Sequence, residues 1–208
     1  GEFELINRLV EGFETVNEST VKSIGDDAAV IEYKEGQIVV STDLLIENIH
    51  FDLIYTPLKH LGYTAVVVNL SDIYAMNAIP EQITVSIGVS NRFSLESLDE
   101  LYDGIKAACK HYKVDLVGGD TSSSNKGLII SVTAIGRALK EDIVYRNTAQ
   151  PGDLICVTGD LGAAFIGIQI LEREKALFVD NPGIKTELAD KAYVVGRQLK
   201  HEARGDII

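Results

Sequence analysis

The hydrophobic residues of this chain follow two spacings, one typical of strands and one typical of helices. Alternating or short apolar runs predict strands at 28–31, from Ile38 onward, and at 81–90, 114–117 and 127–139. Apolar residues three and four apart predict helices at 2–13, 56–76 and 94–112. The order of these elements predicts an α+β fold in which a mixed sheet carries its helices on one face.

A loop-like composition at 149–153 predicts a domain boundary, so we expect residues 1–148 to form an N-terminal domain. The remaining residues, 149–208, contain one predicted strand at 154–158 and predicted helices at 161–175 and 184–200. A segment of this size buries too little apolar surface to form a stable hydrophobic core of its own. We therefore expect 149–208 to be the incomplete start of an α/β C-terminal domain.

Charge and cysteine content narrow the classes of function. The formal net charge is −12, which disfavours nucleic acid or an anionic membrane as a partner. A phosphorylated ligand would need a metal ion to bind such an acidic chain. The two cysteines do not suggest a disulfide framework, no apolar run approaches the ~20 residues that span a bilayer, and no signal peptide is evident. These features predict a cytoplasmic protein.

Three oxygen-bearing side chains, Ser41, Thr42 and Asp43, interrupt the strand that begins at Ile38. Burying hydroxyls and a carboxylate without partners costs several kcal/mol, so a partner is expected nearby. Three hard oxygens favour a hard cation as that partner.

Four aspartates share this kind of context: Asp27 before a strand, Asp43 at a strand end, Asp72 on a helix expected to be buried and Asp120 after a Gly-Gly turn. If they converge, their mutual repulsion requires a counter-charge. An all-oxygen ligand set favours magnesium, manganese or calcium over zinc. The alternative is that each is an ordinary cap or turn residue. Asp72 fits that alternative least, because helix interiors disfavour aspartate.

A Walker-type phosphate loop is absent from the sequence. Gly118 and Gly119 could allow backbone amides to approach a phosphate, or could simply form a tight turn. Spacing alone leaves both explanations open.

Several motifs, in this order along the chain, resemble the thiamine-monophosphate kinase family, within the superfamily of aminoimidazole ribonucleotide synthetase and selenophosphate synthetase. They are Gly25-Asp26-Asp27-Ala28-Ala29, Ser41-Thr42-Asp43, Asn48-Ile49-His50-Phe51, Asn69-Leu70-Ser71-Asp72-Ile73-Tyr74-Ala75-Met76 and Gly118-Gly119-Asp120-Thr121. Gly136-Arg137-Ala138 and Pro151-Gly152-Asp153 also match. The resemblance covers about the first 150 residues, and several ordered motifs are more specific than any single one.

The resemblance implies ATP-dependent phosphorylation of thiamine monophosphate to thiamine diphosphate, with several Mg²⁺ ions and no covalent catalytic residue. It implies a homodimer whose N-terminal domains pair their sheets into a barrel, with the nucleotide near that interface. Position by position, it implies magnesium ligands at Asp27, Ser41, Thr42, Asp43, Asp72 and Asp120, a substrate contact at His50, and nucleotide contacts at Tyr102, Gly119, Asp120 and Arg146.

Some of these residues also have simpler explanations. His50 taken alone resembles a partly buried structural histidine, and Tyr102 a half-exposed helix residue. Arg146 could pair with Glu141 or Asp142 as a solvated ion pair.

One departure from the family concerns a C-terminal motif of the form Asp-x-Ser-Asp-Gly-Leu, which this sequence does not contain. We therefore expect binding to survive in these residues, and turnover to be lost. The alternatives are another ATP-dependent member of the superfamily, or a nucleotide-binding dimerisation fragment without activity.

Overall fold

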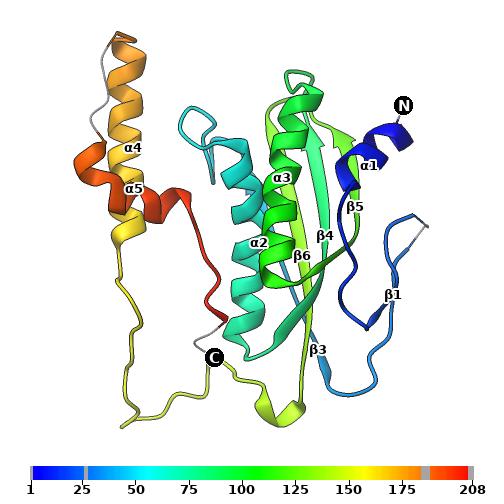
Figure 1. The fold of residues 1–208 in the computed structure, drawn as a ribbon. Helices are drawn as coiled ribbons and strands as arrows, with labels where there is room; N and C mark the ends of the chain where they lie inside the picture. Colours follow the sequence, from blue (N-terminus) through cyan, green and yellow to red (C-terminus); the bar gives the residue numbers. More distant parts are fainter. Residues whose placement is uncertain (1, 26–27, 184–187, 206–208) are drawn as a thin grey trace.

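A four-stranded mixed sheet lies at the centre of the structure, a computed structural model that describes residues 2–25, 28–183 and 188–205 (Figure 1). Its strands are β3 (Gln37–Ile46), β4 (Ile79–Val89), β5 (Asp115–Ser123) and β6 (Leu128–Ala138), in the order β3-β6-β4-β5. β4 and β5 run parallel, and the other pairs are antiparallel. The expected α+β fold with a mixed sheet is confirmed, and β3 and β5 are its two edges.

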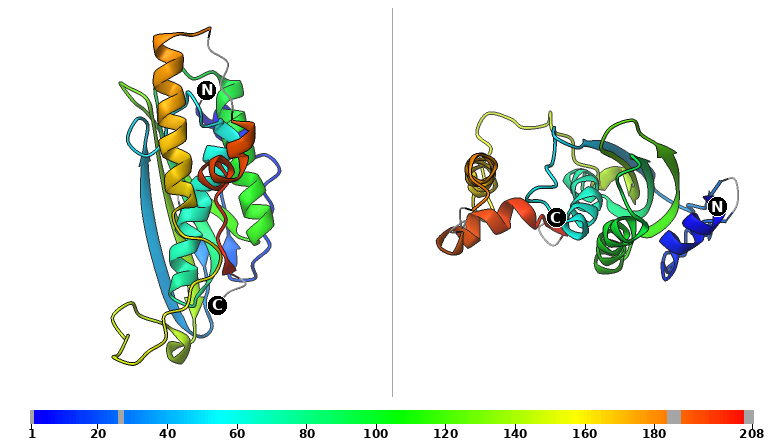
Figure 2. Two further views of the ribbon diagram at one scale, coloured as in Figure 1. Left: turned by 90° about the vertical axis from the view of Figure 1, so that its left-hand side faces the viewer. Right: turned by 90° about the horizontal axis from the view of Figure 1, so that it is seen from above.

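Two helices, α2 (Leu58–Ala75) and α3 (Leu95–Tyr112), cover one face of the sheet (Figures 1 and 2). β6 alternates regularly because Leu128, Ile130, Val132 and Ala134 point under the helices and are almost fully buried. The two helices cross closely at Gly104, where an added Cβ would lie 1.9 Å from the carbonyl oxygen of Lys59. Among the described residues, no helix covers the opposite face of the sheet.

The N-terminal segment runs along the β5 edge of the sheet and comprises α1 (Glu2–Val10), β1 (Thr20–Lys22) and β2 (Val30–Ile31). Asp115, the fully buried first residue of β5, holds the N-terminal segment against this edge through hydrogen bonds. Its carboxylate accepts hydrogen bonds from Val16 N at 2.7 Å, Asn17 N at 3.1 Å and Thr20 Oγ1 at 2.6 Å. A second tie, the ion pair of Arg8 with Asp99, lies near the surface.

We expect Asp115→Ala to lower the free energy of unfolding by about 3 kcal/mol or more, because buried donors would lose a charged acceptor. Asp99→Ala is the matched control. It also removes a carboxylate that holds the N-terminal segment, but an exposed ion pair contributes little to stability because water and salt screen it. Urea unfolding with limited proteolysis checks both. Equal effects of the two substitutions would contradict the role given to Asp115.

The C-terminal residues form 3₁₀ turns at η1 (Lys140–Asp142) and η2 (Ala189–Lys191), and helices α4 (Ala163–Asp180) and α5 (Ala192–Leu199). α4 contacts the segment that precedes α2, where Tyr55 Oη donates to Glu172 at 2.5 Å and Lys175 pairs with Asp52 at 2.6 Å. None of the described helices is long and apolar enough to cross a membrane.

Two expectations for the C-terminal residues are wrong in detail. The predicted strand at 154–158 does not form: Leu154 and Ile155 are 90% and 95% exposed, and no described strand pairs with them. A strand needs a neighbour for its backbone hydrogen bonds, which local sequence does not supply. The helix predicted at 184–200 begins only at Ala192, and residues 184–187 lie outside the described residues.

Candidate functional site

Ser41 and Asp43 lie on the helix-covered face of β3, next to the C-terminal half of α2. They are two positions apart on one strand, so their side chains point to the same face. Ser41 Oγ donates a hydrogen bond to Asp72 Oδ2 at 2.7 Å, which joins β3 to α2. The structure therefore brings Ser41, Asp43 and Asp72 to one edge of the sheet.

Asp72 is exposed, although eight of the 18 residues of α2 are buried. Its neighbour Asn69 is the buried polar residue of this helix, at 1% exposure. Asn69 Nδ2 donates to the carbonyl oxygen of Ala65 at 3.0 Å, and Asn69 Oδ1 has no partner among the described residues. Because Asp72 is exposed, it needs no partner to offset the desolvation of a buried charge. Its carboxylate is accessible to a ligand.

Thr42 points to the opposite face of the sheet, because side chains alternate along a strand. Its Oγ1 donates to the carbonyl oxygen of Val132 at 3.1 Å and accepts from Thr133 Oγ1 at 3.1 Å. The side chains of Ser41, Thr42 and Asp43 therefore do not form one cluster, despite being consecutive.

Gly119 and Asp120 lie on β5, at the other edge of the sheet. Asp120 pairs with Ser86, which is half-buried between the buried Val85 and Ile87 and so belongs to the helix-free face. Three strand spacings of about 4.8 Å separate the two edges, or roughly 14 Å. One chain therefore does not bring Asp120 to Asp43 and Asp72. Asp27 lies outside the described residues.

Tyr102 is 7% exposed and belongs to the core of α3, rather than being the half-exposed residue that its position suggested. It lines a hollow of about 240 Å³ beside Arg8 of α1, on the side of the molecule where β5 lies. Burial raises the pKa of Tyr102 to about 12, so its hydroxyl stays protonated. No local sequence pattern indicated that α1 would lie beside this residue.

Arg146 is exposed in the segment after η1. It forms no ion pair with Glu141, Asp142 or any other residue that the structure describes, so the simpler explanation for it finds no support. Its guanidinium is available for a ligand.

His50 follows β3 in a turn, and its Nδ1 accepts a hydrogen bond from Ile46 N at 3.1 Å. It lines a small cavity of about 50 Å³, together with Tyr55 and Thr56 of its own segment and His201 of the C-terminal residues. Sequence reasoning missed Tyr55 and His201. A loop tyrosine and a histidine near the chain end carry no pattern that would have identified them.

The donors at the β3 edge fit a hard divalent cation chemically, because Asp43, Asp72 and Ser41 offer only oxygen. Among the described residues, however, no three acidic, histidine or cysteine side chains surround a common point. Mg²⁺ usually keeps several waters and takes its remaining ligands from substrate phosphates. An incomplete protein ligand set is therefore compatible with magnesium.

Comparison with known proteins identifies the family. The family described as AIR synthase related protein, N-terminal domain, matches residues 25–138, which is more than half of the chain. The thiamine-monophosphate kinase of Bacillus subtilis (strain 168) is 35% identical over 205 residues, covering 98% of this chain and 60% of that protein. That of Aquifex aeolicus (strain VF5) is 35% identical over 175 residues, covering 84% and 54%.

Solved structures agree in fold. Thiamine-monophosphate kinase from Stenotrophomonas maltophilia K279a has a TM-score of 0.78 at 30% identity, over 99% of this chain and 61% of that one. AaThiL complexed with AMPPCP and TMP has a TM-score of 0.73 at 29% identity, over 99% and 59%. The chain thus spans 54–61% of the length of these relatives. It belongs to the AIR synthase related family, and the relatives named above are thiamine-monophosphate kinases.

Proposed function

We propose that this chain is part of an enzyme that transfers a phosphoryl group from ATP to thiamine monophosphate and forms thiamine diphosphate. The observation that carries the proposal is the 35% identity to a thiamine-monophosphate kinase over 98% of this chain. The meeting of Ser41, Asp43 and Asp72 at one edge of the sheet supports it. A related structure binds AMPPCP, an ATP analogue, together with TMP. The 208 residues alone are expected to bind ligands without turnover, because they span 60% of that relative.

Phosphoryl transfer depends mainly on positioning and on neutralising charge, and bound magnesium supplies that neutralisation. Ser41, Asp43 and Asp72 would hold the metal from the helix-covered side of the β3 edge, and Thr42 would hold it from the opposite side, together with Asp27 and Asp120. The acceptor is a phosphate that is already ionised at neutral pH, so no residue has to act as a strong base. His50 contacts thiamine monophosphate in this proposal.

Two of the proposed nucleotide contacts, Gly119 and Asp120, lie on β5, at the edge opposite β3. Tyr102 lies on the helix-covered face, where it lines the hollow beside Arg8 of α1. Arg146 offers an unpaired guanidinium, which can grip a phosphate through two parallel hydrogen bonds. One chain thus separates the proposed nucleotide contacts on β5 from the proposed metal contacts on β3.

A homodimer would bring the proposed nucleotide contacts on β5 and the proposed metal contacts on β3 together. The helix-free face of the sheet is apolar along β3, where Ile38, Val40 and Leu44 are 58%, 60% and 49% exposed. Exposed apolar patches of this kind favour association, and closing two sheets into a barrel removes their free edges. If β5 of one subunit lies beside β3 of the other, Asp120 of the partner subunit comes next to Thr42 and Asp43. Each site is then built from two chains.

We also propose that residues 1–148 form the nucleotide-binding and dimerisation domain and that 149–208 begin a C-terminal domain. The exposed apolar run at 154–158 supports this division, because it has the composition of a strand whose neighbours are not among the described residues. The net charge of −12 and the unpaired cysteines support a cytoplasmic protein that does not bind nucleic acid.

The second candidate is a nucleotide-binding dimerisation module without activity, which the limited coverage of longer relatives favours for this chain taken alone. Turnover separates the two. We expect thiamine diphosphate from a form of the protein extended beyond Ile208 and none from the 208 residues. An inactive extended form that still binds magnesium–ATP would favour the module.

Calorimetric titration with magnesium–ATP tests the site directly. We expect Asp72→Asn to weaken binding at least about tenfold, since it removes a charged metal ligand from an exposed position and leaves the fold intact. Glu100→Gln is the matched control, because it removes the same charge from an exposed position on α3. Unchanged affinity of Asp72→Asn would remove Asp72 from the site.

A further inference from the structure

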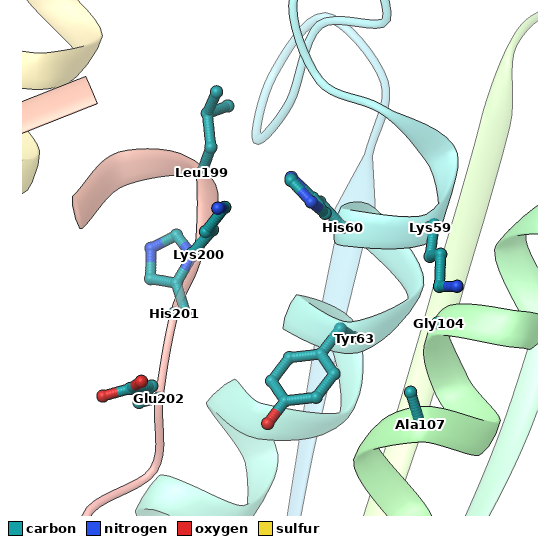
Figure 3. Close-up of a pocket in the computed structure, with 9 residues that line it drawn as sticks. All are labelled: Lys59, His60, Tyr63, Gly104, Ala107, Leu199, Lys200, His201 and Glu202. Carbon is teal, nitrogen blue, oxygen red and sulfur yellow. The ribbon is translucent and has the colours of Figure 1, made fainter. Parts of the chain in front are cut away.

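A cavity of about 270 Å³ lies where the segment after α5 passes over α2 and α3 (Figure 3). It is separate from the β3 and β5 edges discussed above. Three elements contribute its walls, which are formed by Lys59, His60, Tyr63, Gly104, Ala107, Leu199, Lys200, His201 and Glu202. It adjoins the smaller cavity of His50, since Leu199 and His201 line both.

Three of the lining side chains are flat rings with polar atoms. His60 Nδ1 is buried without a partner among the described residues, so it has an unused hydrogen-bonding position. His201 Nδ1 lies 3.3 Å from Thr64 Oγ1, which leaves its Nε2 for other contacts. Burial lowers the pKa of His201, and the charge of Arg197 adds to this. Tyr63 and the two imidazole rings make a surface suited to a planar ring.

The charges around the cavity are unusual for this chain. Lys59 and Lys200 both line it, and neither forms an ion pair with a described residue. Glu202 is the only acidic residue in the lining, although the whole chain carries a net charge of −12. Two unpaired ammonium groups repel a metal ion and attract an anion. The imidazoles are therefore poorly placed to serve as a cation site.

We propose that this cavity binds a small phosphomonoester with a single planar ring, whose ring lies against Tyr63, His60 and His201 and whose phosphate is attracted by the positive charges of Lys59 and Lys200 at the two ends of the cavity (Figure 3). The volume supports a ligand of this size, because pockets for larger, drug-sized ligands measure about 300–1,000 Å³. The site is additional to the nucleotide and thiamine monophosphate contacts proposed above.

The four histidines of the chain provide a direct test with phenyl phosphate as the probe. Proton–carbon spectra of the imidazole rings, assigned with His→Gln variants, should show His60 and His201 shifting together and saturably during titration of the 208-residue chain. His111, which lines a different hollow, should stay unchanged. Phenol alone and inorganic phosphate alone should each bind about tenfold more weakly, because each makes only part of the contacts.

Single substitutions test which side chains contribute to binding. Lys59→Gln and Lys200→Gln should each weaken phenyl phosphate about tenfold, while Lys110→Gln, an exposed lysine of α3 outside the cavity, should have no effect. Ala107→Leu should block binding by filling the cavity from an exposed helix position, with an unchanged melting temperature.

Three outcomes would overturn the proposal: no saturable shift of His60, shifts of His50 and His201 without His60, or equal affinity for inorganic phosphate and phenyl phosphate. The second outcome would place the probe in the His50 cavity. None of them bears on the magnesium–ATP titration of Asp72→Asn, so failure here is distinguishable from failure of the proposed function.

Discussion

Mixing the Asp43→Asn and Asp120→Asn variants is expected to restore magnesium–ATP binding in about one quarter of the sites, although neither variant binds alone. The expectation follows from the strand order β3-β6-β4-β5, which puts Asp43 and Asp120 on opposite edges of the sheet. If each site takes one edge from each subunit, half of the randomly assembled dimers are mixed. Each mixed dimer contains one site with both aspartates and one site with neither.

Calorimetric stoichiometry on co-refolded protein measures the fraction of restored sites. The matched control mixes Asp43→Asn with Asp72→Asn, because Asp43 and Asp72 share the β3 edge through Ser41. Every mixed site then keeps one defect, and we expect no recovery. Recovery in both mixtures, or in neither, would contradict a site shared between subunits.

Gly119→Ala is expected to destabilise the fold by about 3 kcal/mol or more, whereas Gly118→Ala should change stability by less than about 1 kcal/mol. A Cβ at Gly119 would lie 1.9 Å from the carbonyl oxygen of Val85, so the backbones of β4 and β5 would have to separate. A Cβ at Gly118 meets only Thr84 Cγ2, at an ordinary 3.7 Å. Chemical unfolding of the two variants provides the measurement.

The stabilities of these two variants distinguish two reasons for the Gly118-Gly119 pair: close packing of β4 against β5, or the binding of a phosphate. The pairing of β4 with β5 shifts register between Ile83 and Thr84, just before Gly118 and Gly119, and the strands approach closely there. If Gly119→Ala unfolds the sheet, packing alone requires glycine at this position, and its presence is no evidence for a phosphate. A stable Gly119→Ala that loses only nucleotide binding would instead favour the phosphate explanation.

The sequence predicted the N-terminal elements well, because their signals are local. Alternating apolar residues indicated β4 and β6, and helical spacing indicated α2 and α3, all within a few residues of the observed bounds. These predictions hold in the folded chain because the spacing of apolar residues within a helix or strand already determines which of its sides is buried. The strand at 154–158 failed for the opposite reason: its composition is right, but a strand also needs a neighbour.

For the candidate site, the sequence by itself determined only the type of side chain: oxygen-bearing residues at Ser41, Thr42, Asp43, Asp72 and Asp120, in an acidic chain that favours a metal-borne phosphate. The tertiary structure decided which of them meet. Alternation along β3 sends Thr42 to one face and its neighbours to the other, and strand order puts Asp120 at the far edge. Burial of Tyr102 likewise depends on α1, almost a hundred positions away along the chain. Ligand type is a property of single residues, whereas convergence is set by pairings between distant segments, which local patterns do not encode.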